Sequence, residues 1–111
     1  MNWNRLESID QLVEIKEKSL EKPVLIFKHS TRCSISSMVW DRLKRNWKTE
    51  DFDRVDPFFL DLIAHRDISN SISKEFDVYH ESPQIILIKD GKATYDTSHM
   101  GINYNDIMKR L

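Results

Sequence analysis

Residues 24–36 have the sequence VLIFKHSTRCSIS, in which a continuous apolar run leads to Cys33, the only cysteine of the chain. Four apolar residues in a row, at positions 24–27, are typical of a strand that is covered on both faces, as in a parallel sheet. Beyond the cysteine, apolar residues recur at helical spacing: Ile35, Met38, Val39, Leu43 and Trp47. This pattern predicts a strand, a turn that holds Cys33, and a helix that ends near Lys48.

The segments on either side of this unit predict further strands and helices. Before it, we expect a short strand at residues 3–6 and a helix at 9–20, which starts at a capping-box pattern and stops before Pro23. After it, we expect a strand at 57–62, a helix at 68–76, a hairpin with strands 85–89 and 93–97, and a last helix at 105–111. The order βαβαβα followed by ββα is that of a thioredoxin-like α/β fold, with three α/β/α layers around a mixed central sheet.

Size and composition indicate a single domain, residues 1–111. The 111 residues are 40% hydrophobic and include two glycines and three prolines, with no repeat and no linker-like segment. A chain of this length normally forms one core. The formal net charge is -1, which argues against nucleic acid as a partner, because phosphate backbones are bound by clustered Lys and Arg.

No segment predicts export, a membrane span or a metal site. Residues 1–8 are polar, without the apolar stretch of a secretion signal. The longest apolar runs, at 24–27 and 85–88, are far shorter than the ~20 residues that cross a bilayer. A single cysteine cannot form an internal disulfide, and no Cys/His cluster has the spacing of a metal site. We therefore expect a cytoplasmic, metal-free protein that its core alone holds together, and a monomer rather than an oligomer.

Cys33 has the surroundings of a reactive thiol. At a helix N-terminus, free backbone N–H groups and the helix dipole favour a thiolate, and Arg32 adds a positive charge. Ser36 takes the second position of a Cys-x-x-Cys redox motif, where we expect its hydroxyl to donate a hydrogen bond to the sulfur; it cannot resolve a disulfide. The alternative is a cysteine that packs as a small apolar residue, and the strand-turn-helix position argues against it.

A second candidate element is Ser82-Pro83-Gln84, directly before the strand at 85–88. Proline is tolerated at a strand start, where its peptide bond can be cis, although a plain strand-entry proline is the equal alternative. Because histidine titrates near cellular pH, three histidines are candidates to tune the thiolate or to contact an acidic ligand: His29, His80 and His99. The alternative for each of them is a solvated position in a loop.

These segments resemble the YtxJ family of monothiol bacilliredoxins over nearly the whole chain. The resemblance lies in FKHSTRCSIS at 27–36, Arg66 with ISN at 68–70, HESPQ at 80–84, and SH at 98–99. It implies a thioredoxin fold and the removal of bacillithiol, a low-molecular-weight cytosolic thiol, from S-bacillithiolated client proteins. Bacillithiol is then a thiol co-substrate, and no cofactor is tightly bound.

The resemblance also assigns roles to individual residues. Cys33 is the nucleophile with Ser36 beside it, and Pro83 is the cis-proline that faces the cysteine. The residues expected to bind substrate are Thr31, Arg32, Ser82, Pro83, Gln84 and His99. One departure is Ser34. Members of the family usually have proline after the cysteine, and proline makes the turn more rigid than serine does.

Two other functions stay open. In a monothiol-glutaredoxin-like carrier, the Cys33 thiols of two subunits and two external thiols would hold an iron–sulfur cluster. Ile35 departs from the pattern expected before the serine of such carriers. In a thioredoxin-like interaction module, the cysteine would be inert, as the missing resolving thiol and Ser34 would allow.

Overall fold

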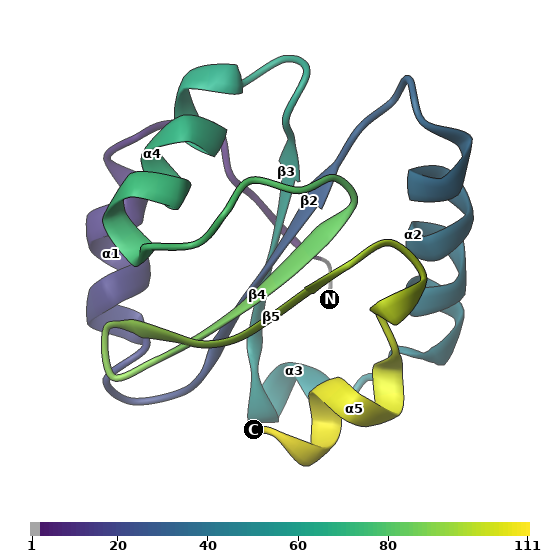
Figure 1. Ribbon diagram of the computed structural model, residues 1–111. Coiled ribbons are helices and arrows are strands. Elements are labelled where there is room, and N and C mark those ends of the chain that lie inside the picture. The colour runs from purple at the N-terminus through teal and green to yellow at the C-terminus, as the bar shows by residue number, and fades with distance from the viewer. Residues whose placement is uncertain (1–2) are drawn as a thin grey trace.

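A five-stranded mixed sheet forms the centre of the computed structural model, which describes residues 3–111 (Figure 1). The strand order is β1-β3-β2-β4-β5, in which β1, β3 and β2 are parallel and β4 and β5 are antiparallel to their neighbours. The elements along the chain are β1 (Asn4–Arg5), α1 (Gln11–Lys18), β2 (Val24–His29), α2 (Ser34–Asn46), α3 (Asp51–Arg54), β3 (Asp56–Asp61), α4 (Arg66–Phe76), β4 (Gln84–Lys89), β5 (Lys92–Ser98), the 3-10 helix η1 (His99–Gly101) and α5 (Tyr104–Lys109). The predicted thioredoxin-like α/β fold is confirmed.

Alternation along β2 divides the core into two halves. Successive side chains of a strand point to opposite faces of the sheet, so Val24 and Ile26 join the core under α1 and α4, whereas Leu25 and Phe27 join the core under α2 and α5. Every residue of β2 is buried, because both faces and both edges are covered. The strand that leads to Cys33 is therefore the centre of the molecule.

The hairpin between β4 and β5 turns at Asp90-Gly91 as predicted. Both residues have positive φ, 53° and 79°, which is the conformation of the tight turn that Asp-Gly favours. The turn is also tied to the end of α1: the N–H of Asp90 donates to the carbonyl of Ser19 and the N–H of Gly91 to its hydroxyl. This link holds the outer hairpin against the body of the protein.

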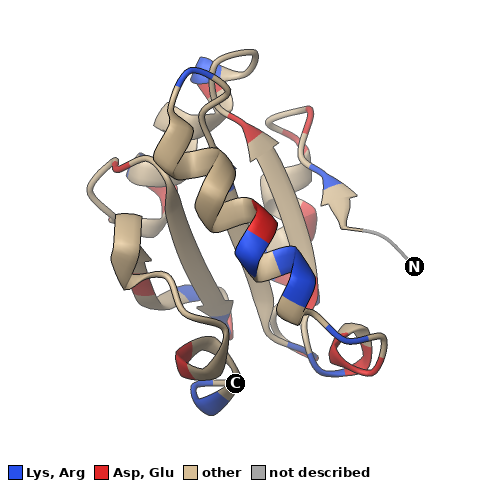
Figure 2. Cartoon of the chain, turned by 90° about the vertical axis from the view of Figure 1, so that its right-hand side faces the viewer, with Lys and Arg blue, Asp and Glu red and all other residues tan. Residues whose placement is uncertain are grey.

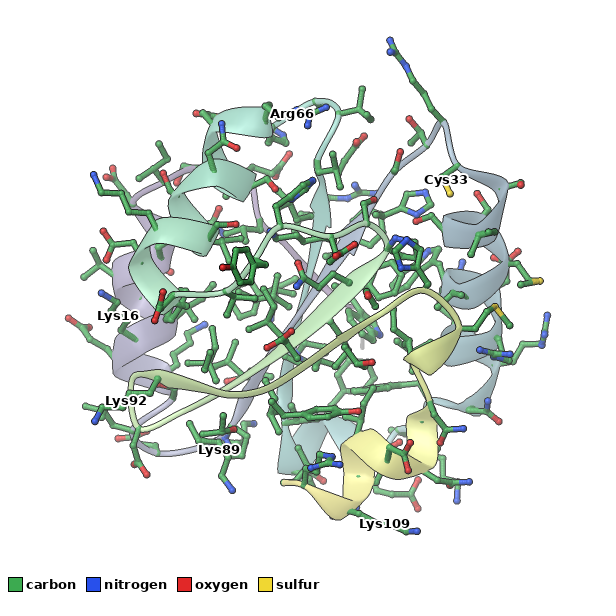
Figure 3. The ribbon with its side chains drawn as sticks, in the orientation of Figure 1. Lys16, Cys33, Arg66, Lys89, Lys92 and Lys109 are labelled. Carbon is green, nitrogen blue, oxygen red and sulfur yellow. The ribbon has the colours of Figure 1, made fainter. Side chains whose placement is uncertain are left out.

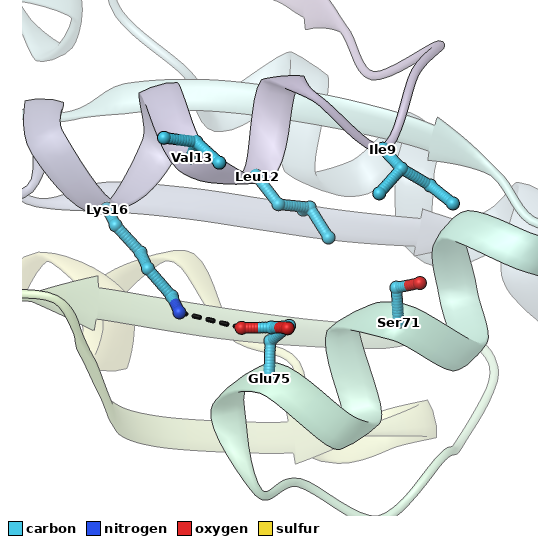
Figure 4. A pocket seen from close by; sticks show the side chains of 6 residues that line it. All are labelled: Ile9, Leu12, Val13, Lys16, Ser71 and Glu75. Atoms are coloured by element: carbon cyan, nitrogen blue, oxygen red, sulfur yellow. Dashed lines mark hydrogen bonds and ion pairs between the residues drawn. The ribbon is translucent and has the colours of Figure 1, made fainter.

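α1 and α4 lie side by side on one face of the sheet and leave a shallow pocket between them (Figure 4). Ile9, Leu12 and Val13 line one side of the pocket and Ser71 lies opposite. An ion pair of 2.7 Å between Lys16 Nζ and Glu75 Oε2 joins the two helices. No helix of residues 3–111 is long and apolar enough to cross a membrane.

Two short elements are absent from the sequence-based prediction, α3 and η1. α3 is held by Asp51, whose buried carboxylate accepts hydrogen bonds from the N–H of Lys48 (2.8 Å) and the hydroxyl of Tyr104 (2.6 Å). A single turn of helix carries no periodicity, so no pattern indicates it. α1 is also shorter than the expected range 9–20, because residues 9 and 10 form a turn before the helix.

We expect Tyr104→Phe to lower the free energy of unfolding by about 1.5 kcal/mol, because the hydrogen bond to the Asp51 carboxylate is lost. Burial and this hydrogen bond raise the pKa of Tyr104 to about 12 from 10, so the stabilisation is complete below pH ~10 and is lost as the pH rises toward 12. Urea denaturation measures the effect. Tyr79→Phe is the matched control, since Tyr79 is 94% exposed, and an equal loss in both variants would contradict the role of Asp51.

Candidate functional site

Cys33 lies between the C-terminal end of β2 and the first residue of α2. It is the N-cap residue of α2, with an extended backbone (φ -113°, ψ 117°), and its side chain is partly exposed. The N–H of Cys33 donates to the carbonyl of Ser30, and its own carbonyl accepts from the N–H of Ser37. Figure 3 shows the sulfur at one end of the molecule, beside the start of the helix. The predicted strand-turn-helix position is confirmed, and it leaves the thiol accessible at a helix N-terminus.

The expected hydrogen bond from Ser36 to the sulfur of Cys33 is not present among residues 3–111; the Ser36 hydroxyl turns inward instead. The side chain is fully buried, accepts a hydrogen bond from the N–H of Ser30 (3.0 Å), and lies 2.8 Å from Nδ1 of His29. Burial is the main cause that lowers the pKa of His29, against the raising charges of Asp61 and Asp41. A neutral imidazole can accept a hydrogen bond from the Ser36 hydroxyl at Nδ1. Ser36 therefore ties the first turn of α2 to the end of β2.

Aromatic rings surround the inner end of this link. The ring centroid of His29 lies 5.5 Å from that of Phe59 and 6.3 Å from that of Phe27, and Trp40 packs on both phenylalanines. The position of His29 is thus set by the core rather than by solvent. This explains how a polar side chain beside the Cys33 turn is held in one orientation.

The segment before β4 reaches the same end of the sheet as Cys33. β4 pairs with β2 in antiparallel fashion, with Lys28 opposite Gln84, so Pro83 comes next to the end of the strand that leads to the cysteine. The Ser82-Pro83 peptide bond is cis, and the carbonyl of Pro83 accepts from the N–H of His99 at 3.0 Å. The Ser82 hydroxyl is buried and has no hydrogen-bond partner within residues 3–111.

Gln84 supports this segment from behind. Its side chain is 1% exposed, donates from Nε2 to the carbonyl of Tyr79 (2.9 Å), and accepts at Oε1 from the N–H of Glu81 (3.3 Å). The amide is thus engaged within the protein, whereas Thr31, Arg32 and His99 are exposed around the cysteine end. Of the residues expected to bind substrate, Pro83 and Gln84 are buried, and so is the hydroxyl of Ser82.

A polar cluster that the site prediction did not include lies under the same segment. Lys28 is fully buried, with Nζ 3.5 Å from the carbonyl of Ser69 on α4 and 3.4 Å from Nδ1 of His80. The Ser69 hydroxyl lies 3.2 Å from the same Nδ1. The only signal for this cluster in the sequence is Lys28, which directly follows the apolar run at 24–27. Because the strand is expected to end with that run, the sequence does not indicate that Lys28 is buried. Among residues 3–111, no group of three or more His, Cys, Asp or Glu is placed to hold a metal ion.

Comparisons with known proteins agree with this fold. A solved structure described as having a thioredoxin fold is 31% identical to this chain, with a TM-score of 0.80, and the match covers 96% of this chain and 90% of that one. A thioredoxin of Malassezia sympodialis is 17% identical (TM-score 0.74; 98% and 87% covered), and one of Fasciola hepatica is 13% identical (TM-score 0.71; 96% and 94% covered), so both share the fold.

The model of one protein family, described as monothiol bacilliredoxin BrxC, matches residues 4–107. The match includes the Cys33 turn, the polar cluster of Lys28, Ser69 and His80, and the segment before β4. The chain therefore belongs to the monothiol bacilliredoxin BrxC family, whose thioredoxin fold it has.

Proposed function

We propose that this protein is a thiol-disulfide oxidoreductase that removes bacillithiol from S-bacillithiolated proteins. The observation that carries the proposal is the single cysteine, partly exposed as the N-cap of α2, at the end of the sheet where the segment of Pro83 leads into β4. Membership of the monothiol bacilliredoxin family supports bacillithiol as the thiol that is removed. In this proposal the protein is a cytoplasmic monomer whose partners are bacillithiol and modified clients, with no nucleic acid and no membrane.

The reaction has two exchange steps. The Cys33 thiolate attacks the bacillithiol sulfur of the client; the client S–S bond breaks, and the client sulfur leaves as a thiolate that takes up a proton. Cys33 now carries bacillithiol in a mixed disulfide. The thiolate of a second bacillithiol, or of another protein, attacks the bacillithiol sulfur of this mixed disulfide; the bond to Cys33 breaks, Cys33 leaves as a thiolate, and the attacking thiol is left in a new disulfide with bacillithiol. With no second cysteine in the chain, the second step needs an external thiol, which predicts ping-pong kinetics.

The surface beside Cys33 suits a polypeptide substrate. Residues 34–40, the first half of α2, carry no charge, and the charged residues begin at Asp41 (Figure 2). Ile35 and Met38 on this part of the helix are exposed. An uncharged, partly apolar face next to the thiol lets client segments of different sequence approach it, because methionine adapts to varied partners.

The test is intact mass spectrometry of the reduced protein after mixing with an S-bacillithiolated client. We expect one bacillithiol adduct on the protein and an equal amount of reduced client, because each exchange transfers one thiol. No transfer from client to protein would contradict the proposal. Visible absorbance after anaerobic reconstitution with iron and sulfide, without thiol transfer, would instead indicate an iron–sulfur carrier.

A further inference from the structure

Lys28 is a buried cation without a counter-charge. Its side chain is 0% exposed, and no carboxylate in the part of the chain that the structure describes forms an ion pair with it. The two contacts of Nζ, to Ser69 and His80, are neutral and long. Burial lowers the pKa of Lys28 to about 8, so it is still charged at neutral pH. An unpaired buried ammonium is unfavourable for stability, which indicates that Lys28 serves something other than stability.

The contact with Lys28 determines which nitrogen of His80 carries the proton. An ammonium group has donors and no acceptor, so Nδ1 of His80 must accept, and the ring proton is then on Nε2. Burial, followed by the charges of Lys28 and Arg66, lowers the pKa of His80, and Glu81 opposes them. His80 is therefore neutral at neutral pH. Because the side chain is exposed overall while Nδ1 faces Lys28, the Nε2–H donor faces solvent.

Arg66 adds an exposed cation in the surroundings of His80. It is the exposed first residue of α4, and it lies close enough for its charge to contribute to the lowered pKa of His80. Two acids could pair with it, Asp67 as its neighbour in sequence and Glu81 as the neighbour of His80, but within residues 3–111 neither forms an ion pair with Arg66. Figure 3 shows Arg66 at the same end of the molecule as Cys33. His80 is joined to the segment of Pro83, which the side chain of Gln84 fixes in place.

We propose that Arg66 and His80 form a subsite for a carboxylate of the low-molecular-weight thiol, and that Lys28 is the positioning residue that holds Nε2–H of His80 toward it. The proposal rests on the function proposed above, in which Cys33 attacks the sulfur of that thiol. A guanidinium and a neutral imidazole N–H are both donors that suit a carboxylate. The substrate class is thus a thiol that carries at least one carboxylate.

Three mixed disulfides test the proposal with the full-length protein. The first joins an uncharged peptide to mercaptosuccinate, the second joins the same peptide to mercaptoethanol, and the third joins a peptide with aspartates beside its cysteine to mercaptoethanol. Peptide release gives the second-order rate constant for Cys33 with each. We expect Arg66→Gln to lower the rate constant for the mercaptosuccinate conjugate about tenfold, as for one lost charged hydrogen bond. The rate constant for the mercaptoethanol conjugate of the same uncharged peptide should stay unchanged.

Arg45→Gln is the matched control, because Arg45 is an exposed cation in the last turn of α2 and its removal makes the same change in net charge. It should leave all three constants unchanged. If Arg45→Gln slows the mercaptosuccinate conjugate as much as Arg66→Gln does, the effect is general electrostatics and the subsite is wrong. If Arg66→Gln slows the aspartate peptide instead, the carboxylate belongs to the client and the proposal is also wrong.

Lys28→Met separates positioning from structure. Methionine has a similar shape without the charge, so we expect an unchanged or higher melting temperature, together with a several-fold lower constant for the mercaptosuccinate conjugate only. A lower melting temperature with equal loss for all three conjugates would show a purely structural lysine and overturn its proposed role. If Cys33 reacts with none of the conjugates in the wild type, the proposed function fails and the subsite with it; normal reaction without any effect of Arg66→Gln overturns the subsite alone.

Discussion

Cys33→Ser is expected to reduce the transfer of bacillithiol from client to protein to background. A serine hydroxyl is not ionised at neutral pH and does not attack a disulfide, and the chain has no other thiol that can replace it. Because the side chain is partly exposed at the N-cap and makes no capping hydrogen bond, the folded state should be nearly unchanged, within about 0.5 kcal/mol. Intact mass spectrometry and urea denaturation of the same preparation measure both effects.

Ser36→Ala is the control that separates the nucleophile from its neighbour. The substitution removes the partner of the Ser30 N–H and of His29, so we expect it to cost about 1–3 kcal/mol of stability. Measurable transfer should persist, since Cys33 is intact. If both variants lost transfer equally while folded, the hydroxyl of Ser36 would be as necessary as the thiol, and the assignment of the nucleophile to Cys33 alone would be wrong.

The elements that could be predicted from sequence are those in which buried apolar residues recur at a regular spacing along the chain. The run at 24–27 and the helical spacing after Cys33 predict β2 and α2 because a strand covered on both faces is apolar throughout and a helix on a sheet has an apolar stripe. α3 and η1 were not predicted, because each is about one turn long and depends on contacts with distant residues. For α3 that contact is the Asp51 carboxylate with Tyr104, 53 positions away.

For the site, the sequence likewise predicts which elements meet but not the directions of their side chains. The sequence predicts that Cys33 and Ser82-Pro83-Gln84 meet, because a strand-to-helix turn and a strand start lie at one end of the same sheet. It does not predict where the side chains point. Gln84 turns inward since its amide satisfies the backbone of residues 79–81, and Lys28 is hidden because β2 continues two residues past the apolar run.

Ser36→Cys is expected to convert the protein from a monothiol to a dithiol type. Position 36 lies three residues from Cys33, a spacing at which side chains on one helical turn can meet. In the wild type its hydroxyl lies 2.8 Å from Nδ1 of His29, so a thiol at this position has a neutral base that can take its proton. A change of rotamer then brings the sulfur from His29 toward Cys33.

The measurable consequence is the lifetime of the bacillithiol adduct on Cys33. In the wild type the adduct should persist until an external thiol arrives; in Ser36→Cys an internal attack releases bacillithiol and leaves a disulfide between the two cysteines. Because the attacking thiol is held at high effective concentration, we expect the lifetime to fall by about 100-fold. Ser34→Cys is the matched control, since neighbouring helical residues do not face each other, and its adduct should persist as in the wild type. An adduct in Ser36→Cys that lives as long as the one in Ser34→Cys would mean that residue 36 stays locked on His29 and Ser30, so that the inward hydrogen bonds of this position, rather than the absence of a second sulfur, keep the site monothiol.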